Sequence, residues 1–176
     1  MVEVVFDPQT YPTLKEKNVT TLYSSEGITR AKAIAPTYHV FGRASEVYWF
    51  FPDSIYLEIY DTAFNIQGTV RADTAYRYER RQIWELKGNV YMTNFEGVRF
   101  QSEHVFWNEQ KETIYSDTVI KITKGETVTI GKKGFTSNQQ LTKWEIFQSD
   151  IEMPVDMKNR SHSEIETPVS VTDSVP

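Results

Sequence analysis

Apolar and polar residues alternate through most of the middle of the chain, which is the pattern of a β-strand with one buried face. In the segment 55–60, for example, Ile55, Leu57 and Ile59 alternate with tyrosine and glutamate. The same alternation recurs in four further segments, 66–73, 90–93, 120–123 and 127–130. The stretch 53–153 contains no proline, which suits a continuous sheet because proline has no N–H to donate. The pattern therefore predicts an all-β fold of antiparallel strands.

The strands also repeat with a period of about 30 residues. Val70, Phe100 and Ile130 are equally spaced, and Ala72-Asp73 corresponds to Ser102-Glu103. Such a period is typical of a hairpin-like unit that buries its apolar face only by stacking on its neighbours. Chance similarity among the strands of one sandwich is the alternative. The charged stretch 76–82 has no helical period and predicts a hairpin turn.

The alternation assigns a set of side chains to the inward face of the sheet. Small residues within the repeat permit close backbone approach or leave space inside. The interior is then either a packed core or a groove. The predicted inward set is Ile55, Leu57, Ile59, Ile66, Val70, Ala72, Trp84, Leu86, Val90, Met92, Phe100, Val105, Ile120, Ile122, Val128, Ile130 and Phe135.

Composition narrows the function classes. The chain has 176 residues, a net charge of −5, 10 Phe, 10 Tyr, 4 Trp and no Cys. An acidic chain lacks the basic face of a general nucleic-acid binder. Without cysteine there are no disulfides and no thiolate metal sites, and the three histidines are far apart in sequence. We expect no metal site and no cofactor.

The acidic residues do not indicate catalysis. They lie at predicted strand ends and turns, where carboxylates commonly resist edge pairing. Asp73 and Glu103 could face each other across neighbouring strands and perform acid–base chemistry, but their outward parity favours solvated carboxylates. No phosphate loop or nucleophile elbow is present. The sequence predicts a protein that is not an enzyme.

The aromatic run Tyr48-Trp49-Phe50-Phe51 cannot be buried entirely on one face of a strand. Some of its rings must cover a sheet end, line an opening or meet a partner, since exposed apolar patches often mark contact sites. Together with Tyr76 and Tyr78, these aromatics support one alternative function, a carbohydrate-binding β-sandwich module.

Four segments carry a family resemblance: 70–76 (VRADTAY), 83–92 (IWELKGNVYM), 100–107 (FQSEHVFW) and 114–117 (IYSD). They closely resemble the LptC family, the membrane-tethered periplasmic component of lipopolysaccharide export. The segments 22–27 (LYSSEG), 51–58 (FPDSIYLE) and 134–139 (GFTSNQ) are similar to the form found in Bacteroidetes-type bacteria. The pattern x-Ala-Asp-x-Ala…Leu-x-Gly-Asn-Val is shared with the related LptA and the N-terminal domain of LptD.

The resemblance implies an open, twisted β-jellyroll whose sheets enclose a hydrophobic groove lined by the inward set. The groove would accept the acyl chains of lipopolysaccharide from the inner-membrane ABC transporter (LptB, LptF and LptG) and pass them to LptA. ATP hydrolysis in the cytoplasm would supply the energy, so this chain would need neither catalytic residues nor a cofactor.

The resemblance also implies partners at the two ends of the jellyroll, where unpaired strand edges can pair with another module. The early strand, with Val19, Leu22 and Tyr23, would face the transporter. The last strand, 141–147, with Leu141, Trp144 and Ile146, would face LptA. The same edges would permit self-association.

Domain boundaries follow from composition and from the extent of the resemblance. We expect a leader at 1–17, a jellyroll domain at 18–154 and a disordered polar tail at 155–176, which has too little apolar content to fold by itself. The expected location is the periplasm, with tethering to the inner membrane by an N-terminal anchor that is not visible in this chain.

Overall fold

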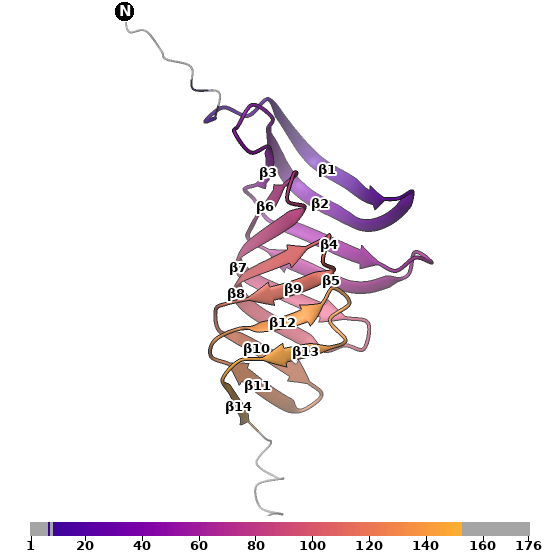
Figure 1. The fold of residues 1–176 in the computed structure, drawn as a ribbon, viewed down its shortest axis with the longest axis vertical. Coiled ribbons are helices and arrows are strands. Elements are labelled where there is room, and N and C mark those ends of the chain that lie inside the picture. The colour runs from indigo at the N-terminus through magenta and orange to yellow at the C-terminus, as the bar shows by residue number, and fades with distance from the viewer. Residues whose placement is uncertain (1–6, 8, 153–176) are drawn as a thin grey trace, which may run out of the picture.

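The computed structural model describes residue 7 and residues 9–152, and this part of the chain contains fourteen strands and no helix. The strands follow one another along the longest axis of the molecule, from β1 near one end to β14 at the other (Figure 1). The all-β prediction is confirmed. The strands are β1 (Leu14–Ser25), β2 (Ile28–Phe41), β3 (Tyr48–Phe51), β4 (Ile55–Tyr60), β5 (Ile66–Ala72), β6 (Thr74–Tyr78), β7 (Ile83–Asn94), β8 (Arg99–Asn108), β9 (Thr113–Ser116), β10 (Ile120–Lys124), β11 (Thr127–Gly131), β12 (Phe135–Asn138), β13 (Trp144–Ile146) and β14 (Ser149–Glu152).

The long strands belong to two layers at once. The first half of β7 pairs with β6, and its second half, after a register shift between Lys87 and Val90, pairs with β5. In the same way β2 pairs with β4 and then β3, and β8 pairs with β10 and then β9. Layer 1 therefore contains β3, β6, β9, β12 and β13, and layer 2 contains β4, β5, β10, β11 and β14. All pairings are antiparallel, which gives a jellyroll-like sandwich.

The two layers are joined along one side, which we call the closed side. Here the chain crosses from one layer to the other between β3 and β4, β5 and β6, β9 and β10, β11 and β12, and β13 and β14. Backbone hydrogen bonds continue through these corners, since Ser54 N donates to Asp73 O (2.7 Å) and Asp73 N donates to Gly88 O (2.9 Å). The repeated pair of a small and an acidic residue lies at these corners. Ala72 and Ser102 are buried there, whereas Asp73 and Glu103 are exposed.

Two glycines on the closed side combine a positive φ with little room for a side chain. Gly88 has φ +75°, and an added Cβ would lie 2.8 Å from the Asp73 carboxylate. Gly134 has φ +89°, and its Cβ would lie 2.0 Å from the backbone oxygen of Ser116. At Gly134 the neighbour is backbone, so only a residue without a side chain permits the approach, whereas at Gly88 the neighbour is the Asp73 side chain, which can turn aside.

The opposite side, which we call the open side, is formed by hairpin turns. The β1–β2, β4–β5, β7–β8 and β10–β11 turns belong to layer 2, and the β2–β3, β6–β7, β8–β9 and β12–β13 turns belong to layer 1. The charged segment 76–82 ends in the β6–β7 turn, as predicted for a hairpin. No strand crosses between the layers here among residues 9–152, so the sandwich is held together on this side by side chains and loop contacts.

The start of the first strand differs from the sequence expectation. β1 begins at Leu14, which pairs with Val40, whereas the folded part was expected to begin at Asn18. Asn18 itself has φ +53°, so it marks a bend within β1. The predicted tail at 155–176 and residues 1–6 and 8 of the predicted leader lie outside the described residues.

Candidate functional site

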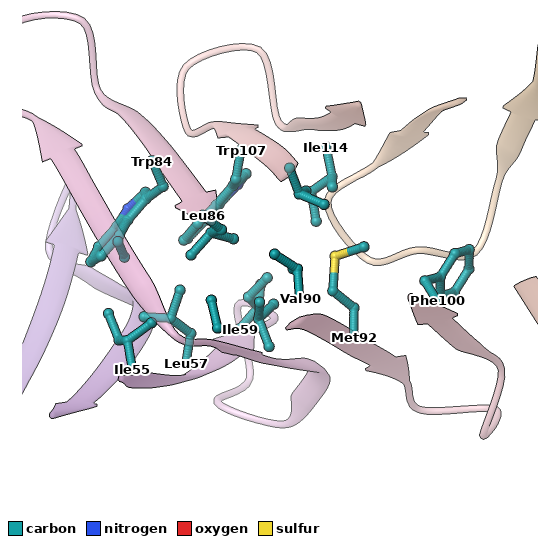
Figure 2. Close-up of a cluster of buried hydrophobic side chains, with 14 of the residues drawn as sticks. Ile55, Leu57, Ile59, Trp84, Leu86, Val90, Met92, Phe100, Trp107 and Ile114 are labelled. Carbon is teal, nitrogen blue, oxygen red and sulfur yellow. The ribbon is translucent and has the colours of Figure 1, made fainter. Parts of the chain in front are cut away.

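The interior between the layers is apolar, and its side chains come from both sheets. Figure 2 shows Trp84 and Leu86 facing Ile55 and Leu57 across the sandwich. Most of the predicted inward set is buried, with 4% exposure or less: Ile55, Leu57, Ile59, Val70, Ala72, Trp84, Leu86, Val90, Met92, Phe100, Val105, Ile120, Ile122 and Phe135. Because exposure is so low, side chains fill the space that a lipid chain would occupy.

Three residues of the inward set are placed differently. Ile66 is 46% exposed because it is the first residue of β5, opposite a register shift between Ile59 and Tyr60. Val128 and Ile130 are only half-buried, since β11 lies near the end of the sandwich and is covered by the short β14. Alternation gives the face of a strand but not how much protein covers that face.

The sequence pattern missed several interior residues. Trp107 and Ile114 are 2% and 1% exposed. Trp107 lies two residues after the inward Val105 in β8 and so points inward as well, and Ile114 is its pairing partner in β9. Arg77 is 9% exposed on the inward face of β6, two residues after the buried Ala75. The alternation along β6 could have placed Arg77 on the inward face, but an arginine is not expected on an apolar face.

Arg77 is compensated by an acidic and aromatic cage. Its Nε and Nη2 donate to the two carboxylate oxygens of Glu109 at 3.0 and 3.1 Å, and Trp84 Nε1 donates to the same carboxylate at 2.5 Å. The guanidinium carbon lies 4.9 Å from the ring centre of Tyr23 and 5.4 Å from that of Trp49. A bidentate ion pair combined with cation–π contacts offsets the cost of burying the charge.

The aromatic run of β3 is divided between the two faces of layer 1. Trp49 points inward, toward Tyr23 and Arg77, and Phe51 is 1% exposed and stacks on Trp84. On the outer face, Tyr48 and Phe50 form aromatic contacts with Tyr76. The outer rings are half-buried and touch one another. Because Trp49 lies on the inner face, it does not belong to the exposed aromatic surface on which the carbohydrate-binding alternative depended.

Free strand edges are present at both ends of the sandwich. Among the described residues, β1 pairs only with β2 and β13 pairs only with β12. Leu22 on β1 is 55% exposed, Val19 is half-buried, and Trp144 and Ile146 on β13 pack partly against the core. The last strand is not the expected one, however, because the chain continues into β14, which pairs with β11.

Two residues expected at the edges lie inside the molecule. Tyr23 is 9% exposed and meets Trp84 edge to face at 5.1 Å between ring centres. Leu141 is fully buried in the β12–β13 loop, with φ +56°, and a positive φ is unusual for leucine. Its carbonyl accepts a 2.9 Å hydrogen bond from the buried side-chain amide of Asn94, the last residue of β7 in layer 2. Leu141 therefore closes part of the open side between the two layers.

A cavity of about 380 Å³ occupies another part of the open side. It lies between the β1–β2 turn of layer 2 and the β6–β7 and β8–β9 turns of layer 1, and Tyr23, Arg77 and Trp107 contribute to its wall. Burial raises the pKa of the Tyr23 phenol well above its ordinary value, and the nearby Arg77 only partly opposes this effect. The phenol is therefore a neutral hydroxyl at any physiological pH.

The carboxylates considered for catalysis lie on the exposed corners. Asn89 lies between the two of them, donating from its side chain to Asp73 at 2.7 Å and from its backbone to Glu103 at 3.3 Å. In the described part of the chain, no group of three or more acidic, histidine or cysteine side chains is arranged to hold a metal ion. The corner carboxylates thus have a structural partner.

Fold and site together define a jellyroll-like β-sandwich with an apolar interior and a free strand edge at each end. The family of LptC-related lipopolysaccharide-assembly proteins matches residues 5–148, and the chain belongs to this family. The resemblance found in the sequence motifs is confirmed. None of the curated proteins compared with the chain matches it.

Family membership assigns the chain to lipopolysaccharide transport. The family consists of transport proteins and is in general periplasmic, with an inner-membrane anchor. Within the described residues, no helix has the length and apolar character needed to cross a membrane.

Proposed function

We propose that this chain accepts lipopolysaccharide from the inner-membrane ABC transporter formed by LptB, LptF and LptG and passes it to LptA. The observation that carries the proposal is the apolar interior, which extends through the sandwich from the buried Ala31 and Ala33 of β2 to Phe135 of β12. Each methylene of an acyl chain that enters such an interior contributes about 0.8 kcal/mol. A short length of contact is enough for a carrier that must also release its cargo.

Acyl chains would enter from the open side. The closed side is hydrogen-bonded through its corners, whereas the open side is held by contacts such as the one between Asn94 and Leu141. Because the interior is filled, entry requires the layers to separate and Leu141 to move. Loops with few backbone hydrogen bonds open more readily than strands within a ladder.

Photo-crosslinking tests the lipid path. A photo-reactive residue at Leu57, Val90 or Phe100, all buried, is expected to capture lipopolysaccharide. Thr69 and Arg71, on the outward face of β5, serve as matched controls and should capture none. Denaturant unfolding of each variant confirms that it is folded before crosslinking. Equal capture at inward and outward positions would contradict the proposal.

Transfer to LptA would use the free edge of β13. Phe147 N donates to Gly134 O, and Lys143 O accepts from Asn138 N. The backbone N–H and C=O groups of the odd-numbered residues along β13 therefore point toward β12. Trp144 and Ile146 therefore direct their backbone groups toward the free edge, since these groups alternate along an antiparallel strand. A second jellyroll module could pair there by strand addition.

A proline at position 146 tests this edge. Ile146→Pro removes an N–H that faces outward, so the domain should remain folded while its association with LptA weakens about tenfold or more, as expected for a broken edge ladder. Ile146→Val keeps the N–H and should bind normally. Glu145→Pro removes an N–H that faces β12 and should destabilise the domain. Unchanged LptA binding by a folded Ile146→Pro variant would place the contact elsewhere.

A further inference from the structure

Two buried polar groups without a hydrogen-bond partner belong to residues that line the open-side cavity. They are the Tyr23 hydroxyl and the Trp107 indole N–H, and both side chains line the cavity. Tyr23 is 9% exposed and Trp107 is 2% exposed. An unsatisfied buried donor is costly, and native proteins leave few of them. The proposed passage of acyl chains does not account for these two polar groups.

The cavity has the size and composition of a binding site for a small polar molecule. Its volume of about 380 Å³ is within the range of roughly 300–1,000 Å³ typical of ligand pockets. Around the two unpartnered groups its wall is formed by serine, glutamine, arginine and glutamate side chains. It thus differs from the apolar interior, which it adjoins through Trp84, the neighbour of both Tyr23 and Trp107.

The charges of the wall exclude a phosphate as the preferred occupant. Three carboxylates, from Glu26, Glu109 and Glu112, outnumber the two guanidinium groups of Arg30 and Arg77. Arg77 already forms a bidentate ion pair with Glu109, so little positive charge is left for an anion. Sugar hydroxyls suit this wall better, because a hydroxyl donates to a carboxylate and accepts from an indole, amide or guanidinium N–H.

We infer that the open-side cavity binds a neutral saccharide unit beside Tyr23 and Trp107, and that a small shift of the side chains around the cavity lets the Trp107 N–H donate to it and the Tyr23 hydroxyl make a second contact. This inference rests on the proposed function in one respect, namely that the saccharide belongs to the amphiphile whose acyl chains enter the adjoining interior. The polar head would then be held at the open side while the chains lie between the layers.

The experiment uses an unphosphorylated β-1,6-linked disaccharide of N-acetylglucosamine, which is neutral, and, separately, inorganic phosphate as probes. Nuclear magnetic resonance distinguishes the indole N–H signals of the four tryptophans. The disaccharide should shift the Trp107 signal and the amide signals of the 109–112 turn in a saturable manner. Trp144, on β13 near the other end of the sandwich, is the internal control and should not respond. Phosphate at the same concentration should leave all of them unchanged.

Two conservative variants test the named groups. Tyr23→Phe and Trp107→Phe each remove one polar group and keep an aromatic ring, so each should weaken disaccharide binding about threefold to tenfold. Tyr115→Phe makes the same chemical change as Tyr23→Phe on the outer face of layer 1 and should bind normally. Tyr23→Phe should also unfold at the same or a higher urea concentration than the parent chain, because it loses an unsatisfied hydroxyl.

The outcomes separate this inference from the proposed function. If the disaccharide gives no shift, or phosphate binds more tightly, the inference is wrong; capture of lipopolysaccharide at Leu57 would still support the relay. If the disaccharide binds at Trp107 but Leu57 captures no lipopolysaccharide, the cavity stands and the relay fails. Equal weakening by Tyr115→Phe, or marked destabilisation by Tyr23→Phe, would overturn the assigned contacts.

Discussion

The closed and open sides of the sandwich are held together by different kinds of contact. On the closed side, the backbone is hydrogen-bonded from corner to corner, and small residues and two glycines allow the layers to meet. On the open side, hairpin turns from the two layers approach each other through side chains, with Leu141 closing one part and a polar cavity occupying another. The closed side is therefore held by backbone hydrogen bonds, and the open side is held by side-chain and loop contacts.

This difference bears on the proposed lipid path, because the interior between the layers is filled. Side chains with almost no exposure leave no open groove between the layers, so a passage must form by local movement. Movement on the closed side would break the backbone ladder, whereas movement on the open side breaks only a few loop contacts. The mechanical asymmetry follows from where the chain crosses between the layers.

The largest effect is expected on the closed side. Gly134→Ala places a Cβ 2.0 Å from the backbone oxygen of Ser116, at a φ of +89°. Neither group can move freely, so the free energy of unfolding should fall by about 4 kcal/mol through overpacking and backbone strain. Urea unfolding followed by fluorescence measures the loss.

Gly125 provides the matched control for this substitution. It lies in the β10–β11 turn of the open side with φ +59°, and no atom lies within 4 Å of an added Cβ. Gly125→Ala should therefore cost only the left-handed backbone strain, about 1 kcal/mol. Similar losses in the two variants would show that the closed side is no more constrained than a turn.

The open side should yield a smaller loss and a local one. Leu141→Ala removes a fully buried side chain and should lower the free energy of unfolding by about 2–4 kcal/mol. Hydrogen exchange should accelerate in the 139–143 loop and at the buried Asn94, while the Asp73 amide on the closed side keeps its protection. Both measurements are made on the folded full-length chain.

Leu22→Ala is the control for Leu141. Leu22 is 55% exposed on β1, and its truncation should change stability by no more than about 0.5 kcal/mol. If exchange in Leu141→Ala accelerates equally on both sides of the sandwich, then Leu141 supports the whole domain and does not act as a local closure.

The contrast between the sides also marks what the sequence could predict. Period-two alternation correctly assigned residues such as Leu57 and Met92 to the interior, because burial of one face is a local property of a strand. The small-acidic repeat falls at the corners, but nothing in the repeat itself indicates that they join two layers. Alternation did not predict Leu141, whose burial depends on a loop that returns across the open side to Asn94, 47 residues away.

Arg77 and the cavity were hidden from the sequence for a related reason. A charged residue at an inward position is understandable only once its partner is known, and Glu109 is 32 residues away. The unpartnered groups of Tyr23 and Trp107 come from strands far apart in the chain, and neither residue type indicates a binding site by itself. Sites that are assembled between the layers require the three-dimensional arrangement.

The smallest expected effect is on the pH dependence of the free energy of unfolding, and it is compared between one acidic residue near each side. On the outer face of layer 1, near the closed side, burial alone would raise the pKa of Glu85, but hydrogen bonds from Lys87, Tyr78 and His104 outweigh it and lower the pKa below its ordinary value of 4.5. In the β4–β5 turn of the open side, hydrogen bonds from the backbone and side chain of Asn65 lower the pKa of Asp61 below 3.8. Both carboxylates therefore bind protons less readily in the folded state than in the unfolded state.

The sign of the effect follows from this difference in proton binding. As the pH falls through 4.5 and then 3.8, the unfolded chain takes up protons before the folded chain does, so the free energy of unfolding decreases toward acid. Glu85→Gln and Asp61→Asn should each make urea stability vary less between pH 7 and pH 3 than in the parent chain. The flattening should be greater for Glu85, whose carboxylate is held by three side chains in a folded sheet, than for Asp61 in an exposed turn. The reverse order would mean that the open-side turn is as firmly organised as the strands beside the closed side.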